Sequence, residues 1–197
     1  MKSAKGVAIL ALMTALVAVA TFVVKIPTVA TEGYLNLGDG LVLFCGVVFG
    51  PFAGLIAGGL GSALADLIGG YAHWMLPTFL IKGLEGALAG GLFFLLRKGK
   101  LNRFLAATLA MLPAAFWMAA GYFFASWMMK GSAAVAWTEA PLNAAQGGVG
   151  VVISILLLTA LSRIKGLSSL IGKNLFFKEP SLPSKEEDSV DPEPPRP

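Results

Sequence analysis

The chain has 197 residues, of which 56% are hydrophobic and only 13% are charged. Soluble proteins average about 25% charged residues, so the composition excludes a water-soluble globular protein and indicates an integral membrane protein. The formal net charge of +4 does not indicate nucleic-acid binding, because the basic residues stand at the ends of apolar runs, where membrane topology accounts for them.

Six apolar segments predict an all-α bundle of six transmembrane helices. They cover residues 7–26, 36–49, 52–68, 75–96, 104–129 and 142–161. The first has about 20 residues, the length needed to cross a bilayer, and Pro27 is expected to end it. We expect this helix to be retained, because no obvious cleavage site for a signal peptide follows it. Pro113 is expected to kink the fifth helix. The expected loops are residues 28–35, 69–74 and 131–139.

Small residues recur at four-residue spacing, a pattern typical of helices that pack backbone to backbone. In the second to fourth segments these residues are Gly46, Gly50, Gly54, Gly58, Gly86 and Gly90. Gly50 and Pro51 fall at the break between two segments, so we expect a tight turn there. On the first helix, Ala11 and Ala15 form a similar pair. That pair would let another helix approach closely, either from this chain or from a partner.

Lysine and arginine are distributed unequally between the two sides of this bundle. If the N-terminus is cytoplasmic, the inner side carries Lys2, Lys5, Arg97, Lys98, Lys100, Arg103, Arg163, Lys165, Lys173 and Lys178, whereas the outer side carries Lys25 and Lys130. The positive-inside rule therefore places both termini in the cytoplasm. Residues 1–178 are expected to form one membrane domain. Residues 179–197, rich in Pro, Glu, Asp and Ser, are expected to form a disordered cytoplasmic tail.

Four charged residues lie inside otherwise apolar segments: Asp39, Asp66, Lys82 and Glu85. A charge at the bilayer centre costs roughly 2.5–3.5 kcal/mol, so these side chains must face one another, water or a ligand. One interpretation is that they only pair and hold helices together. The other is that they build a polar binding site within the bundle.

The predicted depths favour a binding site, because the polar and aromatic candidates converge on the outer half of the bundle. A pocket that is open to the outside and lined by aromatic rings with a few polar groups is typical of a small-molecule site. The candidate substrate-binding residues are Asn36, Asp39, Asp66, His73, Trp74, Lys82, Glu85, Tyr122, Trp127, Trp137, Asn143 and Gln146.

Several candidates also have a simpler interpretation. His73 lies in an expected loop, where a histidine is more often solvated. Trp74, Trp127 and Trp137 would also fit the aromatic belt at the outer membrane interface. Lys82 and Glu85 are spaced to pair with each other. The amides of Asn143 and Gln146 suit the edge of a heteroaromatic ring.

The sequence contains few residues that are suited to catalysis. One histidine and one cysteine, Cys45, are poor components for a metal centre or an activated nucleophile, and we predict no enzyme activity, no metal and no cofactor. No phosphate-binding loop of the GxxxxGK[ST] type is present, so the chain does not hydrolyse ATP by that chemistry. An ion- or proton-coupled carrier that uses Asp39, Asp66, Lys82 and Glu85 as a relay stays open.

Together, four motifs resemble the substrate-binding S component of energy-coupling factor (ECF) vitamin transporters, most closely the branch for pyridoxine, hydroxymethylpyrimidine or similar precursors. They are Tyr34-Leu35-Asn36-Leu37-Gly38-Asp39, then Gly50-Pro51 with Gly54 and Gly58, then Gly61-Ser62-Ala63-Leu64-Ala65-Asp66, and Phe79-Leu80-Ile81-Lys82-Gly83-Leu84-Glu85-Gly86. The resemblance covers about residues 7–161. It implies six helices in a prokaryotic plasma membrane, with a vitamin site near the outer face that the first and fifth loops cap.

The resemblance also implies partners. Ala11 and Ala15 match the small-residue motif by which such proteins dock on a transmembrane coupling subunit, and two cytoplasmic ATPase subunits would supply the energy. The chain would then capture a small heteroaromatic vitamin for ATP-driven uptake. Thiamine, pyridoxine, their precursors and queuosine-like bases all fit a pocket of this composition.

Overall fold

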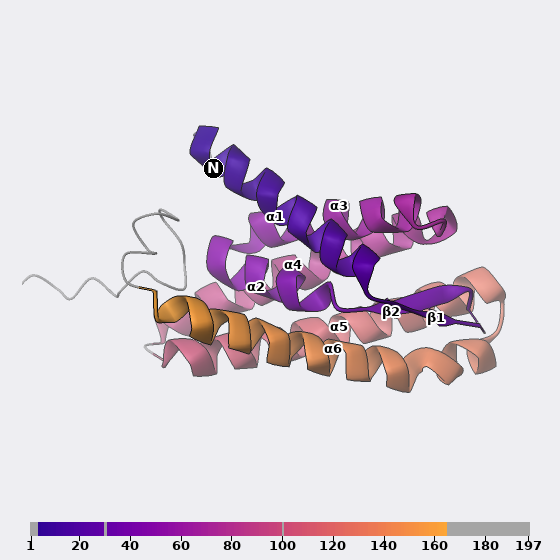
Figure 1. Ribbon diagram of the computed structural model, residues 1–197. Coiled ribbons are helices and arrows are strands. Elements are labelled where there is room, and N and C mark those ends of the chain that lie inside the picture. The colour runs from indigo at the N-terminus through magenta and orange to yellow at the C-terminus, as the bar shows by residue number, and fades with distance from the viewer. Residues whose placement is uncertain (1–3, 30, 100, 165–197) are drawn as a thin grey trace, which may run out of the picture.

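The computed structural model describes residues 4–29, 31–99 and 101–164. Helices dominate this part of the chain, and a short β-hairpin lies at one end of the bundle they form (Figure 1). The elements in order are α1 (Ala4–Val23), β1 (Lys25–Thr28), β2 (Gly33–Asn36), α2 (Asp39–Phe49), α3 (Pro51–Ile68), the 3₁₀ turn η1 (Ala72–Trp74), α4 (Met75–Lys98), α5 (Arg103–Lys130) and α6 (Ala133–Ser162). The predicted tail, residues 179–197, and the domain boundary at residue 178 lie outside the described residues.

Five helices, α1, α3, α4 with η1, α5 and α6, are long and apolar enough to cross a membrane. The sixth, α2, has 11 residues. At 1.5 Å per residue such a helix is about 17 Å long, roughly half of a hydrocarbon core of ~30 Å. The bundle agrees with the prediction of an all-α membrane protein, but α2 is too short to cross the bilayer by itself.

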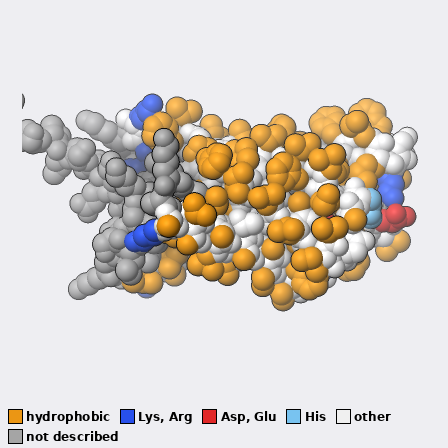
Figure 2. All heavy atoms as spheres, turned by 90° about the horizontal axis from the view of Figure 1, so that it is seen from above, with side chains coloured by type: hydrophobic (Ala, Val, Ile, Leu, Met, Phe, Trp, Pro, Cys, Tyr) orange, Lys and Arg blue, Asp and Glu red, His pale blue; other side chains and the backbone are white. Residues whose placement is uncertain are grey.

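The surface has the distribution of side chains that a bilayer requires. Figure 2 shows hydrophobic side chains over the length of the face it presents, with charged side chains gathered toward the two ends. Large apolar side chains such as Leu12, Phe116 and Leu156 are 59%, 76% and 63% exposed. A soluble protein would bury an apolar surface of this extent.

The segment between the first two helices is a β-hairpin, whereas the sequence predicted a loop at residues 28–35. Helix α1 ends at Val23, and Pro27 lies within β1, opposite Tyr34 in the antiparallel register. Proline is tolerated there because an edge strand needs no donor on its open side. A two-stranded hairpin is marginal alone, and here β2 packs against α6 and α1.

Helix α6 also differs from the prediction, because residues 133–139 are helical rather than part of a loop. Ser132 caps this helix: its hydroxyl oxygen accepts a hydrogen bond from the backbone N–H of Val135 at 3.5 Å. Gly131, with a φ of 66°, ends α5 immediately before. Serine at this position and a left-handed glycine at the preceding helix end are common boundary signals. The two longest helices are therefore joined by a very short turn.

Helix α2 lies at the centre of the bundle, and glycines let α3 and α4 approach it closely. A Cβ atom at Gly86 of α4 would lie 2.6 Å from the carbonyl carbon of Gly54 in α3. A Cβ atom at Gly90 would lie 2.6 Å from the carbonyl oxygen of Gly46 in α2. The predicted backbone-to-backbone packing of these glycines is confirmed, and it fixes α4 against both neighbours.

Candidate functional site

A cavity lies at the hairpin end of the bundle. Helices α1, α3, α4, α5 and α6, the hairpin and η1 all contribute to its lining. The lining residues are Thr21, Thr31, Gly33, Tyr34, Asn36, Ser62, Asp66, Trp74, Thr78, Lys82, Tyr122, Glu139, Asn143 and Gln146. Segments far apart in the chain thus bring aromatic, amide, hydroxyl and charged side chains to one place.

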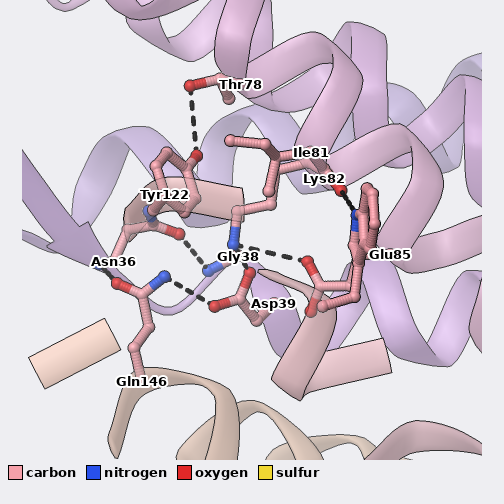
Figure 3. Close-up of polar contacts among 10 residues, drawn as sticks. Asn36, Gly38, Asp39, Thr78, Ile81, Lys82, Glu85, Tyr122 and Gln146 are labelled. Carbon is pink, nitrogen blue, oxygen red and sulfur yellow. Dashed lines mark hydrogen bonds and ion pairs between the residues drawn. The ribbon is translucent and has the colours of Figure 1, made fainter. Parts of the chain in front are cut away.

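The inner part of the cavity is formed by Lys82, which is 1% exposed. Its ammonium group pairs with the carboxylate of Asp39, the first residue of α2, and lies 3.5 Å from a carboxylate oxygen of Glu85 (Figure 3). Asp39 stands in the first turn of α2, where the helix dipole favours a negative charge. A buried charge that loses its partner typically costs 3–5 kcal/mol, so this cluster depends on all of its members.

Gln146 of α6 connects the hairpin to this charged cluster. Its amide oxygen accepts a hydrogen bond from the backbone N–H of Asn36 at 2.8 Å, and its amide nitrogen donates to Asp39 at 2.7 Å. The side-chain oxygen of Asn36 in turn accepts from the backbone N–H of Gly38 at 2.9 Å. Figure 3 shows this chain of contacts converging beside Lys82. The end of β2, the start of α2 and the middle of α6 are therefore held together at the cavity.

Aromatic side chains form the remaining wall. The hydroxyl of Tyr34 donates to Asp66 at 2.5 Å, the hydroxyl of Tyr122 donates to Thr78 at 3.1 Å, and the rings of Trp74 and Tyr122 lie 5.8 Å apart. Burial, together with the charge of Asp66, raises the pKa of Tyr34 well above its ordinary value. Tyr34 therefore stays protonated and keeps donating to Asp66 at physiological pH.

Apart from the ion-paired ammonium group of Lys82, five buried polar atoms in the lining have no hydrogen-bond partner among the described residues. They are the hydroxyl oxygens of Thr21 and Ser62, the indole nitrogen of Trp74 and one carboxylate oxygen each of Asp66 and Glu139. An unsatisfied buried polar group costs about 1–3 kcal/mol, so native proteins rarely keep several together without a purpose. Donors and acceptors that face one small cavity indicate a site for a polar ligand.

The structure brings most of the predicted site residues together. Those that line the cavity are Asn36, Asp66, Trp74, Lys82, Tyr122, Asn143 and Gln146. Asp39 and Glu85 lie directly behind the lining, where both contact Lys82. Substrate binding by these residues stays a prediction, but their convergence at one end of the bundle is a property of the fold.

The other three predicted residues lie away from the cavity. His73 is exposed in η1. Trp127 and Trp137 are 45% and 64% exposed, and their rings lie 6.4 Å and 5.0 Å from the ring of Phe123. This aromatic group on the outside of α5 and α6 fits the interfacial belt better than the pocket.

The sequence did not single out seven of the lining residues: Thr21, Thr31, Gly33, Tyr34, Ser62, Thr78 and Glu139. Single hydroxyl residues in apolar helices are too common to mark a site. Tyr34 stood within a motif, two residues before the candidate Asn36. Glu139 fell in an expected loop. It lines the cavity because residues 133–139 belong to helix α6.

At the tip of the hairpin, Glu32 pairs with Lys130 at the end of α5, with 3.0 Å between the charged atoms. The hydrogen bond from Lys130 and its charge lower the pKa of the Glu32 carboxyl. Glu32 is exposed, so solvent screens the pair. The contact nevertheless joins the hairpin to the α5–α6 end, beside the cavity.

The predicted docking residues Ala11 and Ala15 are exposed on α1. The opposite face of this helix carries its buried residues Met13, Val17 and Thr21. A Cβ atom at Gly61 of α3 would lie 2.7 Å from the carbonyl oxygen of Thr14, so α1 packs closely on α3 with that side. The small-residue face is left free of the bundle.

No group of three or more His, Cys, Asp or Glu side chains among the described residues is arranged to hold a metal ion. Cys45 is buried in α2, and its thiol lies 3.6 Å from the carbonyl oxygen of Ala53, to which it donates. This contact places Cys45 in the core of the bundle, away from the cavity lining.

Two comparisons with known proteins bear on this site. A family model described as "ECF-type riboflavin transporter, S component" matches residues 1–163. A protein of Pyrococcus woesei, described as an uncharacterized protein in gap 3′ region, is 53% identical over 74 residues, which make up 38% of this chain and 49% of that protein. The match therefore spans about half the length of this curated relative. The family model covers every element that builds the cavity.

Proposed function

Since the chain belongs to the family of ECF-type riboflavin transporter S components, we propose that its cavity captures a small heteroaromatic vitamin or vitamin precursor for ATP-driven uptake. The observation that supports this proposal is the composition of the cavity lining, in which the rings of Tyr34, Trp74 and Tyr122 lie together with the amides of Asn143 and Gln146. Aromatic rings bury the face of a flat ligand. Amides donate to and accept from the heteroatoms at its edge.

Riboflavin is the first ligand to test, because the family description names it. Pyridoxine, hydroxymethylpyrimidine and thiamine, which the sequence motifs favour, are the alternatives. All of them contain a flat heteroaromatic ring with polar edges. The lining supports this class rather than one member of it.

The charges on the bundle support a cavity that opens to the outside. Arg97, Lys98, Arg103 and Arg163 stand at the ends of α4 and α6 and the start of α5, opposite the hairpin end. By the positive-inside rule that end is cytoplasmic. The cavity would then face the exterior of a prokaryotic plasma membrane, and both chain ends would be cytoplasmic.

In the proposed mechanism this chain binds its ligand and leaves ATP hydrolysis to partners. The cavity lies at one end of the bundle, so delivery to the other side requires movement of the bundle in the membrane. A transmembrane coupling subunit and two cytoplasmic ATPase subunits would drive that movement, as in the family.

Native mass spectrometry of the protein, purified gently from its host membrane before and after extensive dialysis, tests this proposal. We expect a bound heteroaromatic molecule that dialysis removes, together with complexes that contain the coupling subunit and the ATPases. A chain that emerges alone and empty, yet accumulates vitamin in liposomes under an ion gradient, would contradict it and favour an ion-coupled carrier.

One observation favours that second candidate function: Asp39, Lys82 and Glu85 form a contiguous buried charged cluster. A relay would have to continue from the cluster toward the opposite end of the bundle. Among the described residues the carboxylates are those of Glu32, Asp39, Asp66, Glu85 and Glu139, and none of them stands in the last turns of α4 or α6 at that end. The cluster therefore fits a binding site better than a relay.

The Asn143→Ala variant is expected to weaken ligand binding about tenfold without lowering the melting temperature. Asn143 is 7% exposed and lines the cavity, so its amide is available to the ligand. One hydrogen bond contributes about 0.5–1.5 kcal/mol, and 1.4 kcal/mol is tenfold in Kd. Titration of the purified protein measures the change. Thr159→Ala, on the same helix but far from the cavity, is the control.

An unchanged Kd for Asn143→Ala would remove this residue from the site. Lys82→Ala is also expected to weaken binding, but it would leave two buried carboxylates without their cation. Its loss of affinity would therefore include a loss of stability. Asn143 gives the cleaner test.

A further inference from the structure

Glu139 is a buried carboxylate that neither the sequence motifs nor the charged cluster accounts for. It is 8% exposed, it lines the cavity from α6, and one of its carboxylate oxygens has no partner among the described residues. A buried carboxylate without a partner is expensive. Its retention at this place indicates an acceptor for a group on the ligand.

Glu139 also lies where the cavity meets a second hollow at the surface. It borders a groove between the hairpin and α6, lined by Ile26, Pro27, Thr28, Val29, Leu35, Thr138, Glu139 and Leu142. The same side chain thus faces both the groove and the internal cavity. A ligand that entered between the hairpin and α6 would pass this carboxylate.

The charges around the cavity disfavour an anionic ligand. Lys82 is the one lysine or arginine in the lining, and its ammonium group already contacts Asp39 and Glu85. Asp66 and Glu139 are further acidic groups in the lining. Phosphate sites in proteins generally supply unpaired arginine or lysine, or the free N–H groups of a helix N-terminus. This lining supplies carboxylates instead.

Lys25 is a further cation near the cavity, and its charge acts on Asp66. Its ammonium group lies 4.1 Å from the ring centroid of Phe22, 5.1 Å from that of Tyr34 and 5.5 Å from that of Tyr71. It is not one of the lining residues, and at these distances it makes cation–π contacts.

We propose that the cavity takes the unphosphorylated, neutral or cationic form of its ligand, and that Glu139 sets this preference by accepting a hydrogen bond from the ligand and repelling a phosphate ester. This inference rests on the proposed capture of a heteroaromatic vitamin. Such vitamins occur in both forms, and a phosphate monoester carries about −1.5 to −2 charges at pH 7. Beside an unpaired carboxylate in a poorly solvated cavity, that charge is strongly disfavoured.

Binding of matched ligand pairs to the full-length protein in nanodiscs tests the proposal. The pairs are riboflavin and riboflavin 5′-phosphate, pyridoxine and pyridoxine 5′-phosphate, and thiamine and thiamine monophosphate. In the pair that binds, we expect the unphosphorylated form to bind at least tenfold more tightly. In Glu139→Gln this ratio is expected to fall at least fivefold, because the glutamine keeps the shape of the side chain and removes its charge.

The control is Glu32→Gln, the same change in a carboxylate that is 72% exposed and paired with Lys130; it is expected to leave the ratio unaltered. Equal affinity for both members of a pair, or an unchanged ratio in Glu139→Gln, would overturn the role of Glu139. If the folded protein binds no member of any pair, the proposed vitamin capture itself fails, and this inference falls with it.

Discussion

Replacing Gly86 with valine is expected to prevent stable folding of the bundle, whereas the same change at Gly91 is expected to be tolerated. Both glycines lie in α4. A Cβ atom at Gly86 would lie 2.6 Å from the carbonyl carbon of Gly54 and 2.9 Å from its Cα atom. Backbone atoms cannot move aside as a flexible side chain can. At Gly91, nothing lies within 4 Å of the added atom.

The expected penalty for Gly86→Val is about 3 kcal/mol or more, at the upper end of what overpacking costs. Thermal unfolding in detergent, followed by circular dichroism, measures it. Because both variants place valine inside the same helix, their difference isolates the contact between α3 and α4. Equal melting temperatures for the two variants would show that this contact does not hold the bundle together.

This glycine contact could be predicted from the sequence because it depends on a local signal. Four-residue spacing places Gly86 and Gly90 on one face of a helix wherever that helix lies. The convergence of Asp39 and Lys82 could be predicted for a similar reason, since burying either alone in lipid is too costly. In both cases the physical constraint acts on the residue itself.

The hairpin could not be predicted in the same way. Residues 25–36 contain a proline and a glycine, which favour a loop when the segment is considered alone. The strands form because β2 packs against α6 and α1, and because the backbone of Asn36 donates to Gln146, 110 residues later in the chain. A contact between residues so far apart in the chain produces no periodic pattern in the local sequence.

The tryptophans show why the candidate site was only partly predictable. Trp74, Trp127 and Trp137 all stand near the outer end of the bundle, and depth alone does not distinguish them. Trp74 is 3% exposed and lines the cavity, whereas the side chain of Trp137 is 64% exposed. The rotation of each helix about its own axis decides this difference, and that rotation is set by packing.

The second large effect is expected for Ala11→Trp or Ala15→Trp, which should abolish uptake while leaving ligand binding intact. Both alanines are exposed on α1, opposite Met13 and Val17, which face the bundle. Small residues at this spacing let a partner helix approach closely, and an indole ring would hold it away. The proposed coupling subunit could then no longer bind to this face of α1.

Uptake of labelled vitamin by cells or proteoliposomes that contain the coupling subunit and ATPases measures transport, and titration of the isolated chain measures binding. Ala144→Trp, at an exposed alanine of α6, controls for the added indole ring. Unimpaired uptake in both α1 variants would mean that the partner docks elsewhere.

Loss of binding in the same variants would instead mean that α1 acts through the cavity. Such an effect is physically conceivable, because Thr21 brings the last turn of α1 into the cavity lining. Thr21 lies on the buried face of the helix, however, and Ala11 stands ten residues earlier, nearly three turns or about 15 Å along the axis. A ring added to the opposite face at that distance leaves the lining unchanged. We therefore expect these variants to lose docking of the partner and to keep ligand binding. One face of α1 contributes to the cavity, and the opposite face would contact the partner.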